Sequence, residues 1–495
     1  MSATAETEGA LETRGIEQVP DAERTAKTRG LFPTWVGANI SVLLLTMGAS
    51  LVVAYHLNFW QALVVAFVAP AVSYGLVGFI GIAGKRGAAP GMALSRAVFG
   101  QRGNLLPGAL IWVARWGWET INAVTGAYAL LTILDLGLGI KASPVLDLVT
   151  LLLFVIATFA ISGLGIGAVR TCSKYATYLF GVFSVLVLGY LAVHTHWSAV
   201  MHQGAGSTAS LITAVGMIAA GGVSWIPSAP DFTRYLPRTA SSKAIVGTTM
   251  GGAGIVVMPL VLMGAVMAVA TPDLATASDP VSFVGKILPL WIAVPYLLIA
   301  VVGMLLINSM SMYSAGFTAQ TLGFRIPRHW AVSVNAVISL ALGGVLMLVA
   351  TSFLGSFIAF LSMLAVAFSA WTGVFGADMF RRRSYDGRAM ADTTRTSAYW
   401  YRAGFSPTAV AAWAIGLVMG LMFTTSDWFT GPLAKNNVIG RYGLGWIAAI
   451  VISGVLYLVL PKPAVAAPAP SAGPDEAAEA AGPAETAADR VSAGV

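Results

Sequence analysis

Trp118 and Asn122 lie four residues apart in the stretch ARWGWETINAVTGAY. If this stretch is helical, the two side chains lie one above the other on a single face. A tryptophan face can stack on a flat heterocycle, and an amide beneath it offers a donor and an acceptor to the ring edge. The same two residues could instead pack against lipid and bond a neighbouring helix. The spacing therefore predicts either a site for a planar ligand or a helix–helix contact.

Arg115 and Glu119 have the same four-residue spacing in this stretch. Ionisable residues within a membrane span are functional candidates by default. Glu119 could accept a hydrogen bond from an exocyclic amine, as glutamate does from cytosine. It could also carry a proton, because burial disfavours a charged carboxylate. The alternative is an ion pair between Arg115 and Glu119 that only stabilises the helix.

A second candidate is the stretch GGVSWIPSAPDFTRYLP, which follows an apolar run. Pro227 and Pro230 each remove a backbone donor and interrupt a helix. Broken helices in transporters lie at the substrate site, whereas a helix end with a proline-rich loop is the simpler alternative. At a break, Ser224 and Trp225 would lie beside unpaired backbone groups, and Trp225 could form a second aromatic wall.

Other polar residues could support such a site. Asn308, Ser309 and Ser311 lie deep in the apolar stretch VVGMLLINSMSMYSAGFTAQTLG, where they could bind substrate or a cation, or bond other helices. Asp231 and Arg234 lie in the second half of the second candidate stretch, and we expect them to tie the inner end of that helix to a loop.

The elements that position these residues are membrane spans. The 495-residue chain is 57% hydrophobic and 10% charged, whereas soluble proteins have about 25% charged residues. A single cysteine excludes an internal disulfide, and the five histidines fit no metal motif. The sequence contains no nucleotide-binding GxxxxGK[ST] motif and no catalytic constellation, so we expect neither an enzyme nor an ATP-driven pump, and neither a cofactor nor a metal site.

Twelve apolar spans are expected. They cover residues 32–55, 60–82, 103–134, 145–163, 175–194, 211–235, 244–270, 291–317, 330–350, 354–380, 408–422 and 442–460. We expect a cytoplasmic tail at 1–31, a transporter domain at 32–460 and a disordered cytoplasmic tail at 461–495. Within the domain, the first repeat is 32–194, the second is 211–380, and the accessory helices are 408–460.

The loop charges predict the orientation. With the N-terminus in the cytoplasm, the inner loops hold 17 lysines and arginines and the outer loops hold four. Cytoplasmic loops of membrane proteins carry such an excess, so both termini are expected in the cytoplasm of a cell-membrane protein. Spans one and six, the first with GAN at 37–39 and the sixth with its prolines, lie five spans apart and therefore run in opposite directions. This is typical of an inverted repeat of five plus five helices, followed by two accessory helices.

Over residues 32–460 the chain resembles the purine–cytosine permease family of nucleobase–cation symporters. The resemblance rests on five ordered motifs: WxGAN at 35–39, SRAVFGQRGNLLP at 95–107, GWETINAVTGA at 117–127, SWIPSAPDFTRYLP at 224–237 and MYSAGFTAQTLG at 312–323. It implies a LeuT-like all-α fold in which tryptophans of spans three and six enclose a heterocycle and an amide of span three meets its edge. By motif position these are Trp118, Trp225 and Asn122.

Residue types and resemblance together predict two overlapping sets. The substrate-binding set is Gly37, Asn39, Trp118, Glu119, Asn122, Ser224, Trp225 and Asn308. The cation-coupling set is Gly37, Ala38, Glu119, Ser309 and Ser311.

Two positions depart from the family pattern. Glu119 replaces a residue that is neutral in many relatives, and Leu306 and Ile307 stand where sodium-coupled relatives have hydroxyl side chains. Loss of oxygen ligands weakens a sodium site, which favours proton coupling with Glu119 as the carrier. The predicted function is uptake of a nucleobase, cytosine or a purine, by cation symport. Alternatives are another heterocycle (allantoin, hydantoin, a vitamin precursor), a passive channel or a substrate receptor; no nucleic-acid partner is expected.

Overall fold

The computed structural model describes residues 14–275, 280–324, 328–349, 353–426 and 428–461. Within these residues the chain forms α-helices joined by short turns and contains no β-sheet. In the described part of the chain, nine helices are long and apolar enough to cross a membrane, and three shorter apolar helices complete the twelve predicted spans. The predicted C-terminal tail, apart from residue 461, and residues 1–13 of the predicted N-terminal tail lie outside the described residues.

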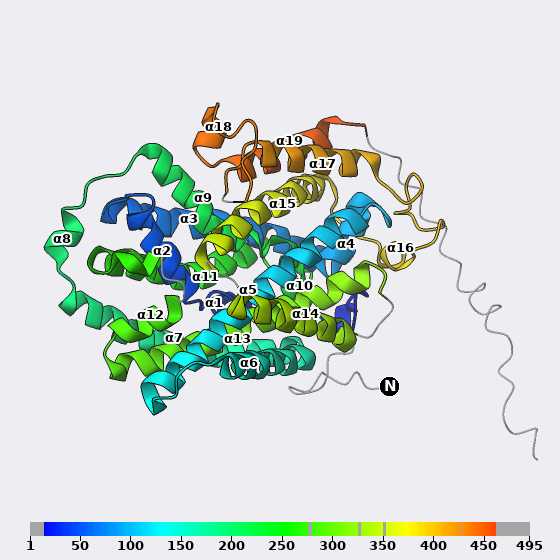
Figure 1. Ribbon diagram of the computed structural model, residues 1–495. Helices are drawn as coiled ribbons and strands as arrows, with labels where there is room; N and C mark the ends of the chain where they lie inside the picture. Colours follow the sequence, from blue (N-terminus) through cyan, green and yellow to red (C-terminus); the bar gives the residue numbers. More distant parts are fainter. Residues whose placement is uncertain (1–13, 276–279, 325–327, 350–352, 427, 462–495) are drawn as a thin grey trace, which may run out of the picture.

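The helices follow the predicted order (Figure 1). The first repeat consists of α1 (Leu31–Gly37) with α2 (Leu43–Val53), α3 (Phe59–Gly87), α5 (Leu105–Leu138), α6 (Pro144–Leu164) and α7 (Ile166–His194). The second consists of α9 (Thr208–Val223) with η3 (Ile226–Ser228) and α10 (Ala229–Thr233), then α11 (Ser242–Ala270), α13 (Leu290–Thr321), α14 (Arg328–Leu348) and α15 (Phe353–Arg381). The accessory spans are α17 (Pro407–Met422) and α19 (Gly445–Val459). Connecting helices are α4 (Gly91–Phe99), α8 (Trp197–Met201), α12 (Pro280–Ile287), α16 (Gly387–Ala391) and α18 (Val438–Arg441).

The predicted start of span five was wrong by nine residues. The helix begins at Ile166, directly after Gly165, whose φ of 91° allows the sharp turn from α6. Arg170 and Lys174 were expected in a loop because they are charged. Both residues lie instead in the first turns of α7. A membrane-spanning helix can continue beyond the hydrocarbon layer of the bilayer, so charged residues near its end need not lie in a loop.

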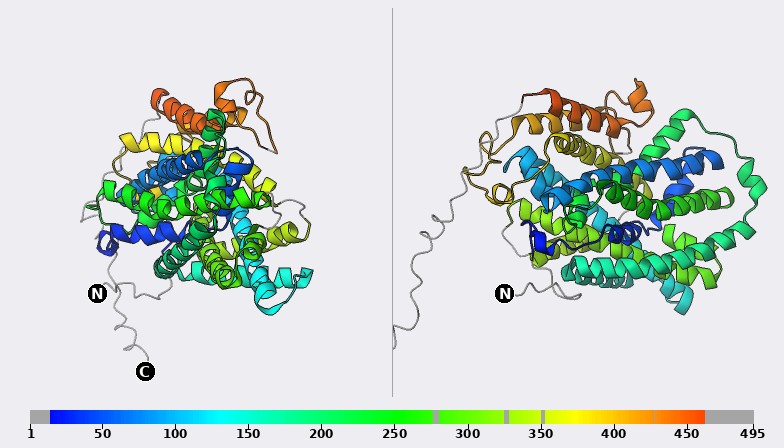
Figure 2. Two further views of the ribbon diagram at one scale, coloured as in Figure 1. Left: turned by 90° about the vertical axis from the view of Figure 1, so that its left-hand side faces the viewer. Right: turned by 180° about the vertical axis from the view of Figure 1, so that it is seen from behind.

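The two repeats pack in equivalent ways. Span one contacts span seven, and its counterpart, span six, contacts span two. Span three contacts span nine, and the equivalent spans of the other repeat, eight and four, also contact each other. Span one contacts span five, and the equivalent spans six and ten do the same. Each contact becomes the other when the two repeats exchange places, which is the pattern of an inverted repeat. The accessory helices α17 and α19 pack against α15 at one edge of the molecule, as all views show (Figures 1 and 2).

Both expected helix breaks are present. Span one is interrupted between Gly37 and Leu43, and the Asn39 amide nitrogen bonds the Trp35 carbonyl at 2.8 Å across this interruption. Span six changes from α9 to a 3-10 turn after Val223 and then to α10. Both prolines of this break lie at the beginning of helical turns, where a missing backbone donor leaves no bond unmade.

Gly48 of span one lies against the backbone of span seven. A Cβ atom at this position would lie 2.1 Å from the Val261 carbonyl oxygen. Reciprocally, a Cβ atom at Gly264 would lie 1.9 Å from the Leu45 carbonyl oxygen. These two glycines therefore allow α2 and α11 to approach backbone to backbone, as small residues do in membrane helix pairs.

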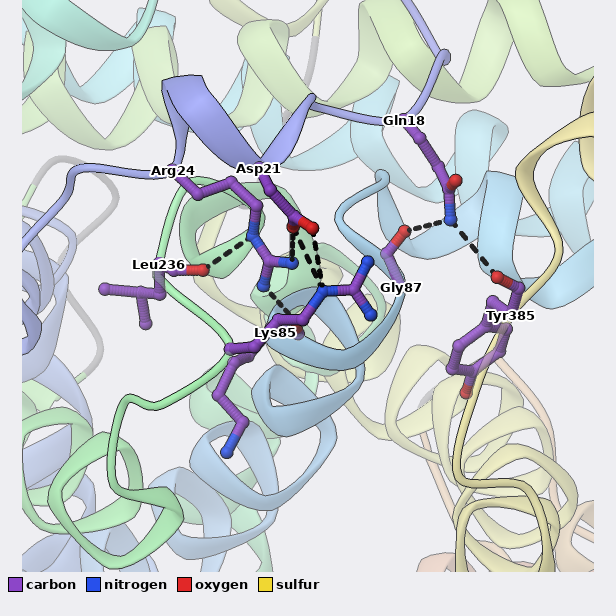
Figure 3. A network of polar contacts seen from close by, with 8 residues as sticks. Gln18, Asp21, Arg24, Lys85, Gly87, Leu236 and Tyr385 are labelled. Atoms are coloured by element: carbon purple, nitrogen blue, oxygen red, sulfur yellow. Dashed lines mark hydrogen bonds and ion pairs between the residues drawn. The ribbon is translucent and has the colours of Figure 1, made fainter.

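Residues 14–30, named here the N-terminal strap, lie across one end of the helix bundle rather than extending away from it. The Val19 nitrogen donates to the Ala88 carbonyl at 2.8 Å. Figure 3 shows the polar contacts, in which Gln18 bonds the Gly87 and Tyr385 carbonyls and buried Arg24 bonds Leu236, Lys85 and Asp21. The strap thus links the ends of spans two and six with the segment after span ten.

Candidate substrate site

A cavity of about 700 Å³, including its mouth, lies between the two broken spans and spans two, three, seven and eight. Its wall is formed by Ala38, Asn39, Ser41, Leu43, Leu44, Met47, Pro70, Ser73, Tyr74, Arg115, Trp118, Asn122, Ile218, Gly221, Gly222, Ser224, Trp225, Val257, Ile307 and Ser311. The wall is mostly apolar with a few polar groups, as is usual for small-molecule sites.

The two predicted tryptophans both line this cavity although they come from different repeats. Trp118 projects from α5 and packs edge-on against Phe360 of α15, with ring centroids 6.2 Å apart. Trp225 lies at the span-six break, edge-on to Trp35 at 6.0 Å and to Phe232 at 6.4 Å. These edge-on contacts hold both tryptophan rings in position, so each ring can serve as an aromatic wall for a flat ligand.

Two predicted polar residues on the wall differ in what they can offer. The Asn39 amide is engaged internally, because its nitrogen bonds the Trp35 carbonyl and its oxygen accepts from the Tyr74 hydroxyl. Asn39 therefore positions the span-one break. Asn122 is buried, and its amide nitrogen has no partner among the described residues, so it can donate to a ligand.

Behind the wall, a polar network joins span three to spans six, eight and nine. The Arg115 guanidinium donates to the Ser311 hydroxyl at 3.3 Å and to the Ser228 hydroxyl. Ser311 in turn donates to Glu119 Oε1 at 3.0 Å, and Asn335 donates to the same oxygen at 3.4 Å. Glu119 is fully buried and its Oε2 has no partner among the described residues.

The direct ion pair considered for Arg115 and Glu119 is not formed within 4 Å in the described chain; the Ser311 hydroxyl bridges the two groups. Arg115 and Ser311 lie on the cavity wall, whereas Glu119 lies behind it. The carboxylate is thus adjacent to the cavity through one hydroxyl. This arrangement suits exchange of a proton better than direct contact with a ligand.

Asp231 and Arg234 bond the inner end of span six to other segments. Asp231 accepts from the Gly91 backbone nitrogen at 2.7 Å and from the Ser314 hydroxyl. Arg234 is fully buried and donates to the Gly15 carbonyl at 2.8 Å. Asp231 therefore joins α10 to the start of α4, and Arg234 joins α10 to the N-terminal strap, as the expected tie to a loop requires.

Besides Glu119, three predicted residues do not line the cavity. Gly37 packs against span five, where a Cβ atom would lie 2.8 Å from Ser173 Oγ. Ser309 faces span four and donates to the Leu305 and Thr158 carbonyls at 2.6 and 3.4 Å. Asn308 is completely buried, and neither atom of its amide has a partner among the described residues.

Sequence reasoning missed three residues of the site. Tyr74 bonds Asn39, and Asn335 bonds Glu119 while accepting from the indole nitrogens of Trp112 and Trp116 at 3.1 and 3.2 Å. An asparagine within an apolar span is a signal that could have indicated Asn335, whereas a tyrosine gives none. Ser228 lies in the motif already quoted, but its type alone does not indicate a bond to a guanidinium.

Comparison with known proteins decides the family. The family model described as "Permease for cytosine/purines, uracil, thiamine, allantoin" matches residues 18–445. The chain belongs to this family. It is 26% identical over 473 residues to the Bacillus subtilis protein YxlA, which carries a purine–cytosine permease name, covering 92% of this chain and 96% of that protein. It is 23% identical to the purine-cytosine permease fcyB of Emericella nidulans, covering 88% and 85% of the two chains.

Solved structures show the same fold. MHP1, a nucleobase-cation-symport-1 family transporter in a closed conformation with bromovinylhydantoin bound, superimposes with a TM-score of 0.73. It is 19% identical and covers 90% of this chain and 94% of its own. A Na⁺-coupled sialic acid symporter gives a TM-score of 0.57 at 14% identity, covering 90% and 92% of the two chains. The solved structures thus show the predicted LeuT-like fold, and the family shows a multi-pass membrane permease rather than an enzyme.

Proposed function

We propose that this permease imports a nucleobase, cytosine or a purine, by proton symport across the cell membrane. The observation that supports the substrate class is the cavity itself, in which Trp118 and Trp225 face a common space at the helix breaks and Asn122 offers an amide. Base–aromatic stacking contributes about 1–3 kcal/mol per base. A planar ring between these two side chains would use both walls of the site.

Transport would follow alternating access. Spans one, two, six and seven contact one another through α2, α3, α9 and α11, and spans three, four, eight and nine form a second group. The cavity lies between the two groups. Rocking of one group against the other would open the cavity to one side of the membrane at a time.

Proton coupling rests on Glu119. The carboxyl group is buried one hydroxyl away from the cavity and near the guanidinium of Arg115, which can stabilise the ionised form. Ser309 and Ser311 of the predicted cation-coupling set do not share one site, because Ser309 bonds span four and Ser311 bonds Glu119. Glu119 can therefore hold a proton when the site is loaded and release it on the other side.

Uptake into proteoliposomes tests this proposal. The purified protein would be supplied with labelled cytosine, adenine, guanine, hypoxanthine or uracil under an imposed pH gradient, with and without sodium. Accumulation of a nucleobase above its external concentration under the pH gradient alone is the expected result. Uptake that needs a sodium gradient would contradict proton coupling, and selective uptake of allantoin, hydantoin or a vitamin precursor would replace the substrate class. Equilibration without accumulation indicates a channel, and binding without uptake indicates a receptor.

The proposed orientation has both termini in the cytoplasm and can be tested by thiol labelling. With Cys172 replaced by serine, a cysteine at exposed Ser143 should react with a membrane-impermeant maleimide in intact cells. A cysteine at exposed Arg383 should react after the cells are opened. The reverse pattern would invert the topology.

A further inference from the structure

Arg115 has more hydrogen-bond donors than the protein uses. A guanidinium has five N–H groups. The two bonds to Ser311 and Ser228 occupy two of them, and Nε is buried without a partner among the described residues. The side chain is 3% exposed, so bulk water does not satisfy the remaining donors. Because a buried, unmet donor on a charged group is costly, the site favours an occupant with acceptors.

The guanidinium is also held in place on the cavity wall. Its two hydroxyl partners come from η3 and α13, and its central carbon lies 5.7 Å from the centroid of the Trp225 ring. A ligand stacked on Trp225 therefore lies next to a fixed, planar fork of N–H groups. Arginine forks bind the carbonyl oxygen and adjacent ring nitrogen of guanine in the same bidentate manner.

The other polar groups of the cavity add few acceptors for a ligand amine. The Asn39 amide oxygen already accepts from Tyr74, and the Ser224 hydroxyl is directed to the Gly221 carbonyl at 2.6 Å. Asn122 contributes another donor without a partner among the described residues, and its amide oxygen is the acceptor that remains for a ligand. The Glu119 carboxylate, the acceptor suited to an amine, lies behind the wall.

We infer that the cavity selects 6-oxopurines over 6-aminopurines, and that Arg115 is the specificity-determining residue. This inference rests on the proposed nucleobase function and narrows its purine substrates to oxopurines such as hypoxanthine or guanine. Adenine presents an amino group where hypoxanthine and guanine present the carbonyl oxygen that, together with the imidazole ring nitrogen, accepts from an arginine fork.

One ligand pair tests the inference directly. Hypoxanthine and adenine share the imidazole acceptor nitrogen but differ at one ring position, where a carbonyl with its neighbouring N–H replaces an amine with its neighbouring acceptor nitrogen. Dissociation constants would be measured by calorimetry on the detergent-purified full chain. Hypoxanthine should bind about 5- to 150-fold more tightly, which is the discrimination of a good bidentate contact.

Variants connect the preference to the guanidinium. Arg115→Lys keeps the charge but loses the fork, so the preference should fall to within about twofold. Arg383→Lys makes the same change at an exposed arginine that does not line the cavity, and it should keep the preference. If the Arg115 variants fail to fold, the comparison in the unmodified protein still decides the matter.

The outcomes separate the two proposals. A preference for hypoxanthine that Arg115→Lys abolishes supports the inference. Equal or tighter binding of adenine overturns it and leaves the nucleobase function standing. Absence of binding by hypoxanthine, guanine, adenine and cytosine overturns the proposed function, and the inference with it.

Discussion

Replacement of Glu119 by glutamine should uncouple transport from the pH gradient while leaving the site intact. Glutamine keeps an oxygen that can accept from Ser311 and Asn335, which lie 3.0 and 3.4 Å from Glu119 Oε1. Its amide nitrogen takes the place of Oε2, which has no partner among the described residues. A buried unmet donor costs about 1–3 kcal/mol, so the variant should fold with reduced stability.

The expected accumulation ratio of substrate depends on how many protons move with it in each cycle. Glu119 supplies one proton per cycle if it is the carrier. A difference of one pH unit corresponds to about 1.4 kcal/mol per proton, which is a tenfold concentration ratio. The unmodified protein should therefore accumulate substrate roughly tenfold per pH unit, and Glu119→Gln should only equilibrate it.

The assay is steady-state accumulation in proteoliposomes, with exchange of labelled for unlabelled substrate measured on the same preparation. Exchange needs binding and access but no net proton movement, so it should persist in Glu119→Gln. Asp231→Asn is the matched control, because Asp231 is also buried but bonds Gly91 and Ser314. Tenfold accumulation by Glu119→Gln, or its loss in Asp231→Asn alone, would refute the assignment of the proton to Glu119.

Four further predictions concern the residues that line the cavity, the packing of α2 on α11 and, in two cases, the N-terminal strap. Trp118→Ala and Asn122→Ala should each weaken nucleobase binding by calorimetry, the tryptophan change by about 1–3 kcal/mol, and together abolish uptake. Gly48→Val should lower the thermal stability by about 1–3 kcal/mol or more, because a Cβ atom would lie 2.1 Å from a carbonyl oxygen of α11. Arg24→Ala should increase hydrogen exchange in residues 16–26, since it removes bonds to two carbonyls. Hydrogen bonds to Arg238 and Arg24 lower the pKa of Asp21 from its ordinary 3.8, so this contribution to strap docking should be constant from pH 8 to 5 and lost as the pH falls through the lowered value.

Each of these predictions has a control. Trp60 is 61% exposed, so Trp60→Ala should leave nucleobase binding unchanged. A Cβ atom at Gly254 of α11 meets nothing within 4 Å, so Gly254→Ala should not lower stability. Equal thermal stability of Gly48→Val and the unmodified protein would contradict the close packing of α2 on α11. Strap exchange that rises between pH 8 and 5 would exclude Asp21 as its titrating group.

The sequence alone predicted the spans and the two breaks, whereas the family resemblance singled out Trp118 and Trp225, which line one cavity. Spans are determined by the length of apolar runs, and breaks by proline and glycine, which are local properties of the chain. The odd number of spans between the breaks then required an inverted relation. The start of span five was missed because charge marks the edge of the apolar layer and not the end of a helix.

Tertiary structure decided which polar side chains meet the cavity. Residue spacing shows which side chains share a helix face, but not how that face is rotated toward neighbouring helices. Asn39 is engaged with Tyr74 from another span, and Ser309 faces span four, although both types suit a binding site. Arg115 reaches the wall while Glu119 lies behind it, because Ser311 of a distant span is inserted between them. The chemistry available to a ligand therefore depends on contacts between residues nearly 200 positions apart, which no local pattern encodes.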